Sequence, residues 1–205
     1  SIFVRVDQSR THLWKALITG PDDTPYSNGA FVFDIALPPD YPSVAPKVLL
    51  TTTGNGSVRF NPNLYADGKV CLSLLGTWHG DQGESWHRDR STVLQVLMSI
   101  QALILVPDPY FNEPGLEVNR GTRAGDRDSD EYNQQIREHT LRHAILAQLR
   151  RPPPEFADVV RAHFRLKRPA ILAQCERWVS MASSSMKSTI IRLRDDVTAE
   201  LNRLS

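Results

Sequence analysis

The sequence predicts an α+β protein, in which a four-stranded antiparallel meander precedes a central helix and a helical C-terminal extension. Three observations lead to this fold class. Four runs of β-forming residues follow one another with short links near the start of the chain. A strongly apolar run of helix length comes next, and helical periodicity dominates the last third. Successive strands with short links are typical of a meander.

Each expected strand is bounded by turn-forming residues. A polar join, Asp7-Gln8-Ser9-Arg10, predicts a hairpin between the first two strands. A loop rich in glycine and proline (residues 20–26) leads to the third strand, which ends at Pro38-Pro39. A proline-containing loop at 41–47 precedes the fourth. The expected strands are residues 2–7, 12–19, 29–37 and 48–53.

Helices are expected from residue 92 onward. The length and spacing of apolar residues in 92–106 favour a buried helix. The segment 121–130 is polar and contains glycine, and Asp128 with Glu131 three residues later predicts the cap of the next helix. Three prolines at 152–154 break the chain, and a hinge is expected at Ser183-Ser184-Ser185. The expected helices are residues 92–106, about 128–149, 155–164, 167–181 and an amphipathic last helix spanning 190–204.

Length and composition limit the organisation and the function. The 205 residues, 40% of them hydrophobic, suit one domain of about 150 residues plus an extension, which we place at 1–150 and 151–205. A net charge of +1 argues against electrostatic binding of nucleic acid. The longest apolar run, 102–106, is too short to span a bilayer. No histidine or cysteine spacing typical of a metal site occurs.

The chain begins directly in an expected strand, without a leader, so we expect it to be part of a longer protein. Two cysteines and no leader indicate a reducing compartment, and we expect a cytoplasmic location.

The stretch from Phe60 to Leu72 carries the chemistry. Pro62 restricts the backbone of Asn61, and Asp67-Gly68 predicts a tight turn. This geometry places the side-chain amide of Asn63 near Cys71, eight residues later. A thiolate is a good nucleophile, and a nearby amide N–H stabilises the oxyanion that forms when a thioester is attacked. The alternative for an isolated cysteine is a buried packing residue, which is the interpretation we favour for Cys175.

The sequence Asn61-Pro62-Asn63, seven further residues and then Cys71-Leu72 resembles the active-site signature of ubiquitin-conjugating enzymes. That family commonly has His-Pro-Asn, and the histidine replaced by Asn61 is regarded as structural. Other segments match in order: the Gly-Pro loop, the Tyr-Pro loop and Trp86. The resemblance implies the ubiquitin-conjugating-enzyme fold, without the family's usual first helix, over residues 1–150.

The resemblance also implies a mechanism and its partners. An activating enzyme passes ubiquitin to Cys71 as a thioester, and a lysine of a protein substrate then attacks it. Asn63 donates to the oxyanion or keeps the active-site loop in shape. Leu72 and Ser73 lie beside the sulfur. The activating enzyme uses the ATP, so no cofactor and no metal are expected here.

Two further regions are implicated by resemblance. Glu113 falls where an acidic residue lines the groove beside the cysteine and orients the incoming lysine. The exposed face of the central helix holds the donor ubiquitin in the family, and Gln95, Met98 and Ala102 are candidates for that face, with core packing as the alternative for Met98.

Some features depart from the family or leave alternatives open. Ser43 stands where a large apolar residue often contacts RING ligases. The stretch from Trp78 to Gly83 is extra length, either a tolerated loop or a rim of the site. His79 and His87 are candidate bases, but the family chemistry requires none.

Three rival or wider hypotheses remain. A non-catalytic ubiquitin-binding relative commonly lacks the cysteine, and a cysteine hydrolase needs a histidine base held by a third group. The motifs after Cys71 resemble the subgroup of large conjugating enzymes with helical extensions, which includes inhibitors of apoptosis and hybrid conjugating-enzyme/ligases. Membership implies a larger parent protein, through which the domain could form oligomers.

Overall fold

A computed structural model describes residues 1–78 and 85–204, and its core is one antiparallel sheet with the strand order β1-β2-β3-β4. Each strand pairs with the next along the chain, with registers such as Val4 opposite Ala16 and Ala16 opposite Phe33. The predicted meander is therefore confirmed. The strands are β1 (Ile2–Val6), β2 (Leu13–Thr19), β3 (Ala30–Ala36) and β4 (Lys47–Leu50).

One face of the sheet packs on the central helix, which consists of α1 (Val93–Ser99) and a π-helical continuation, η2 (Ile100–Ile104). Thr92 and Gln95 form a reciprocal capping box at its start. The buried side chains of the helix meet alternate residues of β2 and β3, because successive side chains of a strand point to opposite faces. These are Ala16, Ile18, Phe31, Phe33 and Ile35, facing Val93, Val96, Leu97, Ile100 and Ile104.

The central helix is only half buried. Leu94, Met98 and Leu103 are 60%, 54% and 60% exposed. Core packing of Met98 is therefore wrong, and Leu94 and Leu103 do not contribute to the buried face that the apolar run suggested. The helix buries one stripe and leaves an apolar surface on the other side.

The next helix begins earlier than the sequence suggested. Its N-cap is Thr122, whose hydroxyl accepts a hydrogen bond from the backbone N–H of Gly125. The expected cap, Asp128, lies inside the helix and pairs with Arg127. The prediction treated the glycine at position 125 as a loop residue. Gly125 instead lies inside the helix and permits close backbone packing, because a Cβ there would lie 2.1 Å from the carbonyl oxygen of Asn119.

Helices then continue to the end of the described chain. α2 (Arg123–His139), the π-helical η5 (Thr140–Leu146) and α3 (Ala147–Arg150) follow one another without interruption. Three more follow the prolines: α4 (Ala157–Leu166), α5 (Arg168–Met181) and α6 (Lys187–Arg203), with the expected serine hinge before α6. Short 3₁₀ turns are η1 (Ser73–Leu75), η3 (Pro109–Asn112), η4 (Glu117–Asn119) and η6 (Pro154–Phe156). None of the described helices is long and apolar enough to cross a membrane.

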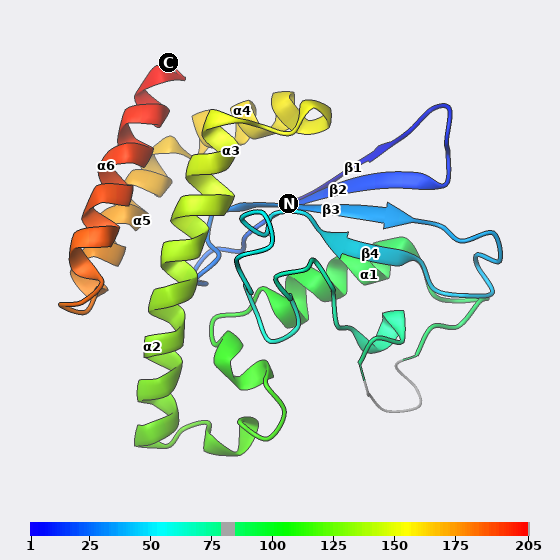
Figure 1. Ribbon diagram of the computed structural model, residues 1–205, viewed down its shortest axis with the longest axis horizontal. Helices are drawn as coiled ribbons and strands as arrows, with labels where there is room; N and C mark the ends of the chain where they lie inside the picture. Colours follow the sequence, from blue (N-terminus) through cyan, green and yellow to red (C-terminus); the bar gives the residue numbers. More distant parts are fainter. Residues whose placement is uncertain (79–84, 205) are drawn as a thin grey trace.

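These C-terminal helices cover part of the second face of the sheet. Leu17, Ala30 and Val32 share a buried cluster with residues on both sides of position 150, including Ile145 and Phe164. Figure 1 shows α1 on one side of the sheet and α4 on the other. The helices after the prolines are thus built into the core. The division at residue 150 stays a prediction.

A buried polar network joins the C-terminal helices to the loop before β3. The side chain of Gln174 on α5 accepts a hydrogen bond from Asn28 Nδ2 (2.7 Å) and donates to the carbonyl oxygen of Ser27 (2.9 Å). His163 Nε2 lies 3.0 Å from the carbonyl oxygen of Asn28. Gln174 is 1% exposed, so water cannot replace these bonds.

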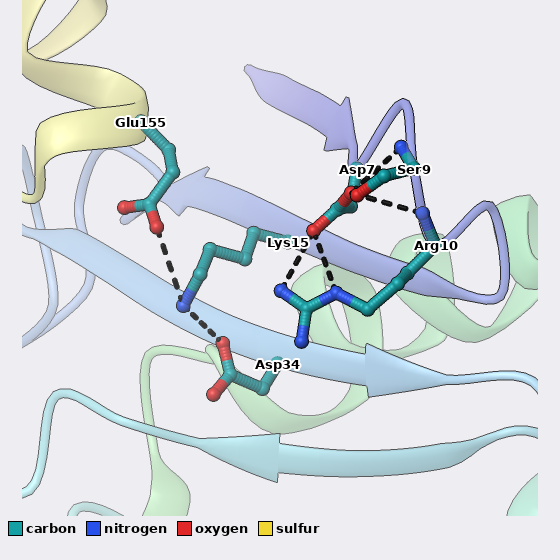
Figure 2. A network of polar contacts seen from close by, with 6 residues as sticks. All are labelled: Asp7, Ser9, Arg10, Lys15, Asp34 and Glu155. Atoms are coloured by element: carbon teal, nitrogen blue, oxygen red, sulfur yellow. Dashed lines mark hydrogen bonds and ion pairs between the residues drawn. The ribbon is translucent and has the colours of Figure 1, made fainter.

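The rest of the second face forms a groove of about 510 Å³, floored by apolar side chains such as Leu13 and Leu49 and edged by charged ones. Figure 2 shows Lys15 between Asp34 (2.7 Å) and Glu155 (3.8 Å), the latter contributed by η6. In the hairpin turn, Asp7 accepts hydrogen bonds from Ser9 and Arg10. These pairs are largely exposed and contribute little stability individually.

We predict that Gln174→Ala lowers the free energy of unfolding by about 1–3 kcal/mol, because it leaves the Asn28 amide and the Ser27 carbonyl buried without their partner. Urea denaturation followed by circular dichroism measures this difference. Gln135→Ala, at an exposed position of α2, serves as the control and is expected to unfold like the wild type. Equal midpoints for the two variants would show that the network does not hold the C-terminal helices in place.

Candidate active site

A short hairpin brings Asn63 and Cys71 together, as the sequence predicted. The backbone N–H of Cys71 donates to the carbonyl oxygen of Asn63 at 2.9 Å, and that of Tyr65 donates to Lys69 at 3.0 Å. The expected tight turn closes the hairpin at Gly68, which has a φ of 92° and would place a Cβ 2.6 Å from the carbonyl oxygen of Leu50. Only glycine meets both conditions without strain.

The side chain of Asn63 is also tied to the cysteine. Its Nδ2 donates to the backbone carbonyl oxygen of Cys71 at 2.9 Å. Its Oδ1 is buried and has no hydrogen-bond partner among the described residues. The amide therefore braces the backbone that carries the sulfur, and its N–H group is engaged by the Cys71 carbonyl oxygen.

The segment after the cysteine is held by Thr77. Its hydroxyl accepts from the backbone N–H of Leu72 (3.0 Å) and donates to the carbonyl oxygen of Val70 (2.7 Å). Cys71 itself is 2% exposed. The 3₁₀ turn η1, which starts at Ser73, follows directly. The thiol thus sits on a backbone fixed on both sides.

Next to Cys71 lies a groove of about 380 Å³ between η1 and the central helix. Leu72, Ser73 and Gln95, three of the residues expected to contact ubiquitin, line it. The other two, Met98 and Ala102, are exposed on the same helix. Gln95, Met98 and Ala102 share one face of the helix by their spacing, and Gln95 joins that face to the groove. The role of the five residues in binding stays a prediction. The other lining residues are Leu74, Ser85, Arg90, Ser91, Ser99 and Leu103.

Asn61 is fully buried and uses every polar atom of its side chain. Its Nδ2 donates to the hydroxyl of Tyr26 (3.0 Å) and to the carbonyl oxygen of Ile104 (2.8 Å). Its Oδ1 accepts from the backbone N–H of Asn63 (2.8 Å) and from Asn112 Nδ2 (3.4 Å). An asparagine at this position therefore packs without unpaired groups, and it connects the central helix to the cysteine hairpin.

Glu113 lies beyond the hairpin and has a cationic partner that sequence reasoning missed. Its carboxylate lies 3.2 Å from Arg59 Nη2, which also donates to the carbonyl oxygen of Pro62 (2.7 Å). The Arg59 guanidinium stacks 4.4 Å from the ring centre of Tyr65. No local pattern marks the pair of Arg59 and Glu113, because the two residues are 54 positions apart.

The remaining candidates fall outside this arrangement. Trp86 donates its indole N–H to the carbonyl oxygen of Pro42 (2.7 Å), while Ser43 is exposed. His87 is exposed and contacts the backbone of its own turn. His79 and most of the extra stretch lie outside the described residues. Within residues 1–78 and 85–204, no three His, Cys, Asp or Glu side chains are grouped to hold a metal ion.

Cys175 is a packing residue, as expected. It is 0% exposed, and burial raises the pKa of its thiol to about 12. A thiol that stays protonated is a poor nucleophile.

Comparisons with known proteins agree with this geometry. The family model described as ubiquitin-conjugating enzyme matches residues 2–140. The human dual E2 ubiquitin-conjugating enzyme/E3 ubiquitin-protein ligase BIRC6 is 57% identical over 180 residues, covering 88% of this chain and 4% of its own length. A probable ubiquitin-conjugating enzyme from Caenorhabditis elegans, protein 17, is 51% identical over 199 residues, covering 97% of this chain and 27% of its own length.

The likeness extends to other relatives and to a solved structure. The probable ubiquitin-conjugating enzyme E2 R521 of Acanthamoeba polyphaga mimivirus is 46% identical over 204 residues, covering 100% of this chain and 14% of its own length. The E2 domain of a Toxoplasma gondii ubiquitin-conjugating enzyme superposes with a TM-score of 0.52 at 30% identity, over 70% of this chain and 88% of that one. The chain thus spans only a small part of the curated relatives. It belongs to the ubiquitin-conjugating enzyme family.

Proposed function

We propose that this domain accepts ubiquitin on Cys71 as a thioester from an activating enzyme and transfers it to lysines of protein substrates. The observation that carries the proposal is the hairpin in which the backbone and the side chain of Asn63 both bind Cys71. It holds one thiol, 2% exposed, on a rigid backbone, and the two residues that follow line a groove. A catalytic histidine is not needed, because a thioester is already reactive and the enzyme contributes mainly positioning.

The two steps balance without a cofactor in this domain. In loading, the Cys71 thiolate displaces the thiol of the activating enzyme from the carboxyl carbon of ubiquitin. In transfer, a lysine amine nitrogen forms a bond to that carbon, the C–S bond breaks and the Cys71 thiolate leaves. The lysine ammonium loses two protons over the whole transfer.

Asn63 serves the transfer step. Nδ2 now donates to the Cys71 carbonyl, and giving up such a bond costs about 0.5–1.5 kcal/mol. The rearranged amide then donates to the oxyanion of the tetrahedral intermediate, where it is worth more than it is on a neutral carbonyl. Glu113 receives the lysine ammonium.

The groove beside Cys71 takes the donor ubiquitin. Leu72 and Ser73 flank the thioester, and Gln95 lines the same groove. Met98 and Ala102 extend the contact along the exposed side of the central helix, where Leu94 and Leu103 add apolar area. Removing this apolar surface from water favours the association.

The parent protein is proposed to be large. Because the matched relatives are much longer than this chain, and one is a dual conjugating enzyme and ligase, we place this domain within a protein that both carries ubiquitin and selects substrates. Regulation of apoptosis in the cytoplasm is its proposed setting. Residues 1–150 form the catalytic part and residues 151–205 the helical extension.

Cys71→Ala is expected to abolish thioester formation, because it removes the only atom that carries the acyl group. The assay mixes the domain with an activating enzyme, ubiquitin and ATP and separates the products on gels with and without reductant. Cys175→Ala is the matched control and should load like the wild type, since Cys175 is buried in the cluster between the second face of the sheet and the C-terminal helices. A reductant-sensitive adduct that persists in Cys71→Ala would refute the assignment. A folded wild type that never loads would indicate a non-catalytic relative.

Asn63→Ala should load ubiquitin normally but discharge it to lysine roughly 100-fold more slowly, the cost of losing one oxyanion donor. Single-turnover discharge of preloaded enzyme measures the rate, and denaturation of the same variant measures its stability. Asn119→Ala, at an exposed position, provides the comparison. Discharge at the wild-type rate would make Asn63 dispensable.

A further inference from the structure

The face of the hairpin that carries Cys71 continues beyond Asn63. Asn63 lies opposite Cys71, Leu64 opposite Val70 and Tyr65 opposite Lys69. Side chains two residues apart on a strand share a face, and directly opposite residues share it too. Tyr65 and Lys69 therefore lie beside Asn63 and Cys71, on the face opposite to the side chains of Leu64 and Val70.

Arg59 holds this face to the loop that carries Glu113. A single nitrogen, Nη2, donates to the Pro62 carbonyl oxygen (2.7 Å) and to the Glu113 carboxylate (3.2 Å). The guanidinium stacks on Tyr65 at 4.4 Å, and Lys69 Nζ lies 5.5 Å from the same ring centre. One side chain thus joins three segments: the Asn-Pro-Asn loop, the cysteine hairpin and the loop after η3.

Stability does not explain this arrangement. The side chains of Arg59 and Glu113 are 43% and 44% exposed, and ion pairs this exposed contribute little to folding. The contacts do, however, fix the orientation of the Arg59 guanidinium. A guanidinium is planar and donates in a fixed fork, so its stack on Tyr65 and its bond to Pro62 set where the Glu113 carboxylate is held.

We propose that Arg59 is a positioning residue for ubiquitin transfer, which holds Glu113 against the hairpin face that carries Cys71. This rests on the proposed function of the site. A carboxylate accepts hydrogen bonds on two oxygens, and Arg59 Nη2 contacts Oε2, so an incoming lysine ammonium binds at Oε1. Arg59 stays attached to Pro62, Tyr65 and Glu113, so the carboxylate delivers the amine to one place relative to the thioester.

The test uses enzyme preloaded with ubiquitin and chased with increasing concentrations of free lysine. Arg59→Gln should load within about twofold of the wild type, as most surface substitutions are mild. It should raise the lysine concentration for half-maximal discharge roughly tenfold, a modest effect for a misplaced reacting group. Arg59→Lys keeps the charge without the fork and should fall between the two. Arg127→Gln, which removes an exposed ion pair on α2, is the control.

Two further measurements separate positioning from damage. Hydroxylamine is a neutral nucleophile that needs no carboxylate, so its discharge rate should be unchanged in Arg59→Gln. In a double-mutant cycle, Arg59→Gln should add nothing to Glu113→Gln, because it acts through that carboxylate.

Three results would overturn the proposal: wild-type discharge to lysine in Arg59→Gln, equal slowing with hydroxylamine, or independent effects of the two substitutions. Failure of the wild type to load at all would instead remove the proposed function of the site.

Discussion

The buried side chain of Asn61 is the interaction on which the active site depends. Its two N–H groups reach Tyr26 in the loop between β2 and β3 and Ile104 at the end of the central helix, and its oxygen holds the backbone of Asn63. A buried polar group is costly unless it is fully paired, and here it is. The same residue therefore fixes the distance between the core of the domain and the hairpin that carries Cys71.

This anchoring suits a reaction in which the protein acts mainly by positioning the reacting groups. Thioester exchange and aminolysis require no metal and no base of unusual strength, so the value of the site lies in a thiol that does not move. Asn63 and Thr77 brace the backbone on either side of Cys71. A groove lies between η1 and the central helix, and Arg59 links the hairpin to Glu113. In the proposed mechanism the donor ubiquitin occupies this groove and the acceptor lysine meets Glu113.

The sequence was sufficient for the strands, the central helix and the pairing of Asn63 with Cys71, because each depends on local pattern or short spacing. It was insufficient where distant segments meet. The contacts of Asn61 with Ile104 and of Arg59 with Glu113 span 43 and 54 residues, and no periodicity reveals them. The exposure of Met98 depends on which side of the helix the sheet covers. The start of α2 was misplaced because a glycine that permits close backbone contact resembles a glycine in a loop.

Hydrogen exchange at the backbone amide of Cys71 tests the central role of Asn61 most directly. That amide donates to Asn63, whereas the amide of Leu37 donates to His12 at the far end of the sheet and serves as the reference. In Asn61→Ala, loss of the buried bonds, worth about 1–3 kcal/mol, should speed exchange at Cys71 roughly 5- to 150-fold and leave Leu37 much less affected. Unchanged protection at Cys71, or an equal loss at both amides, would contradict the account.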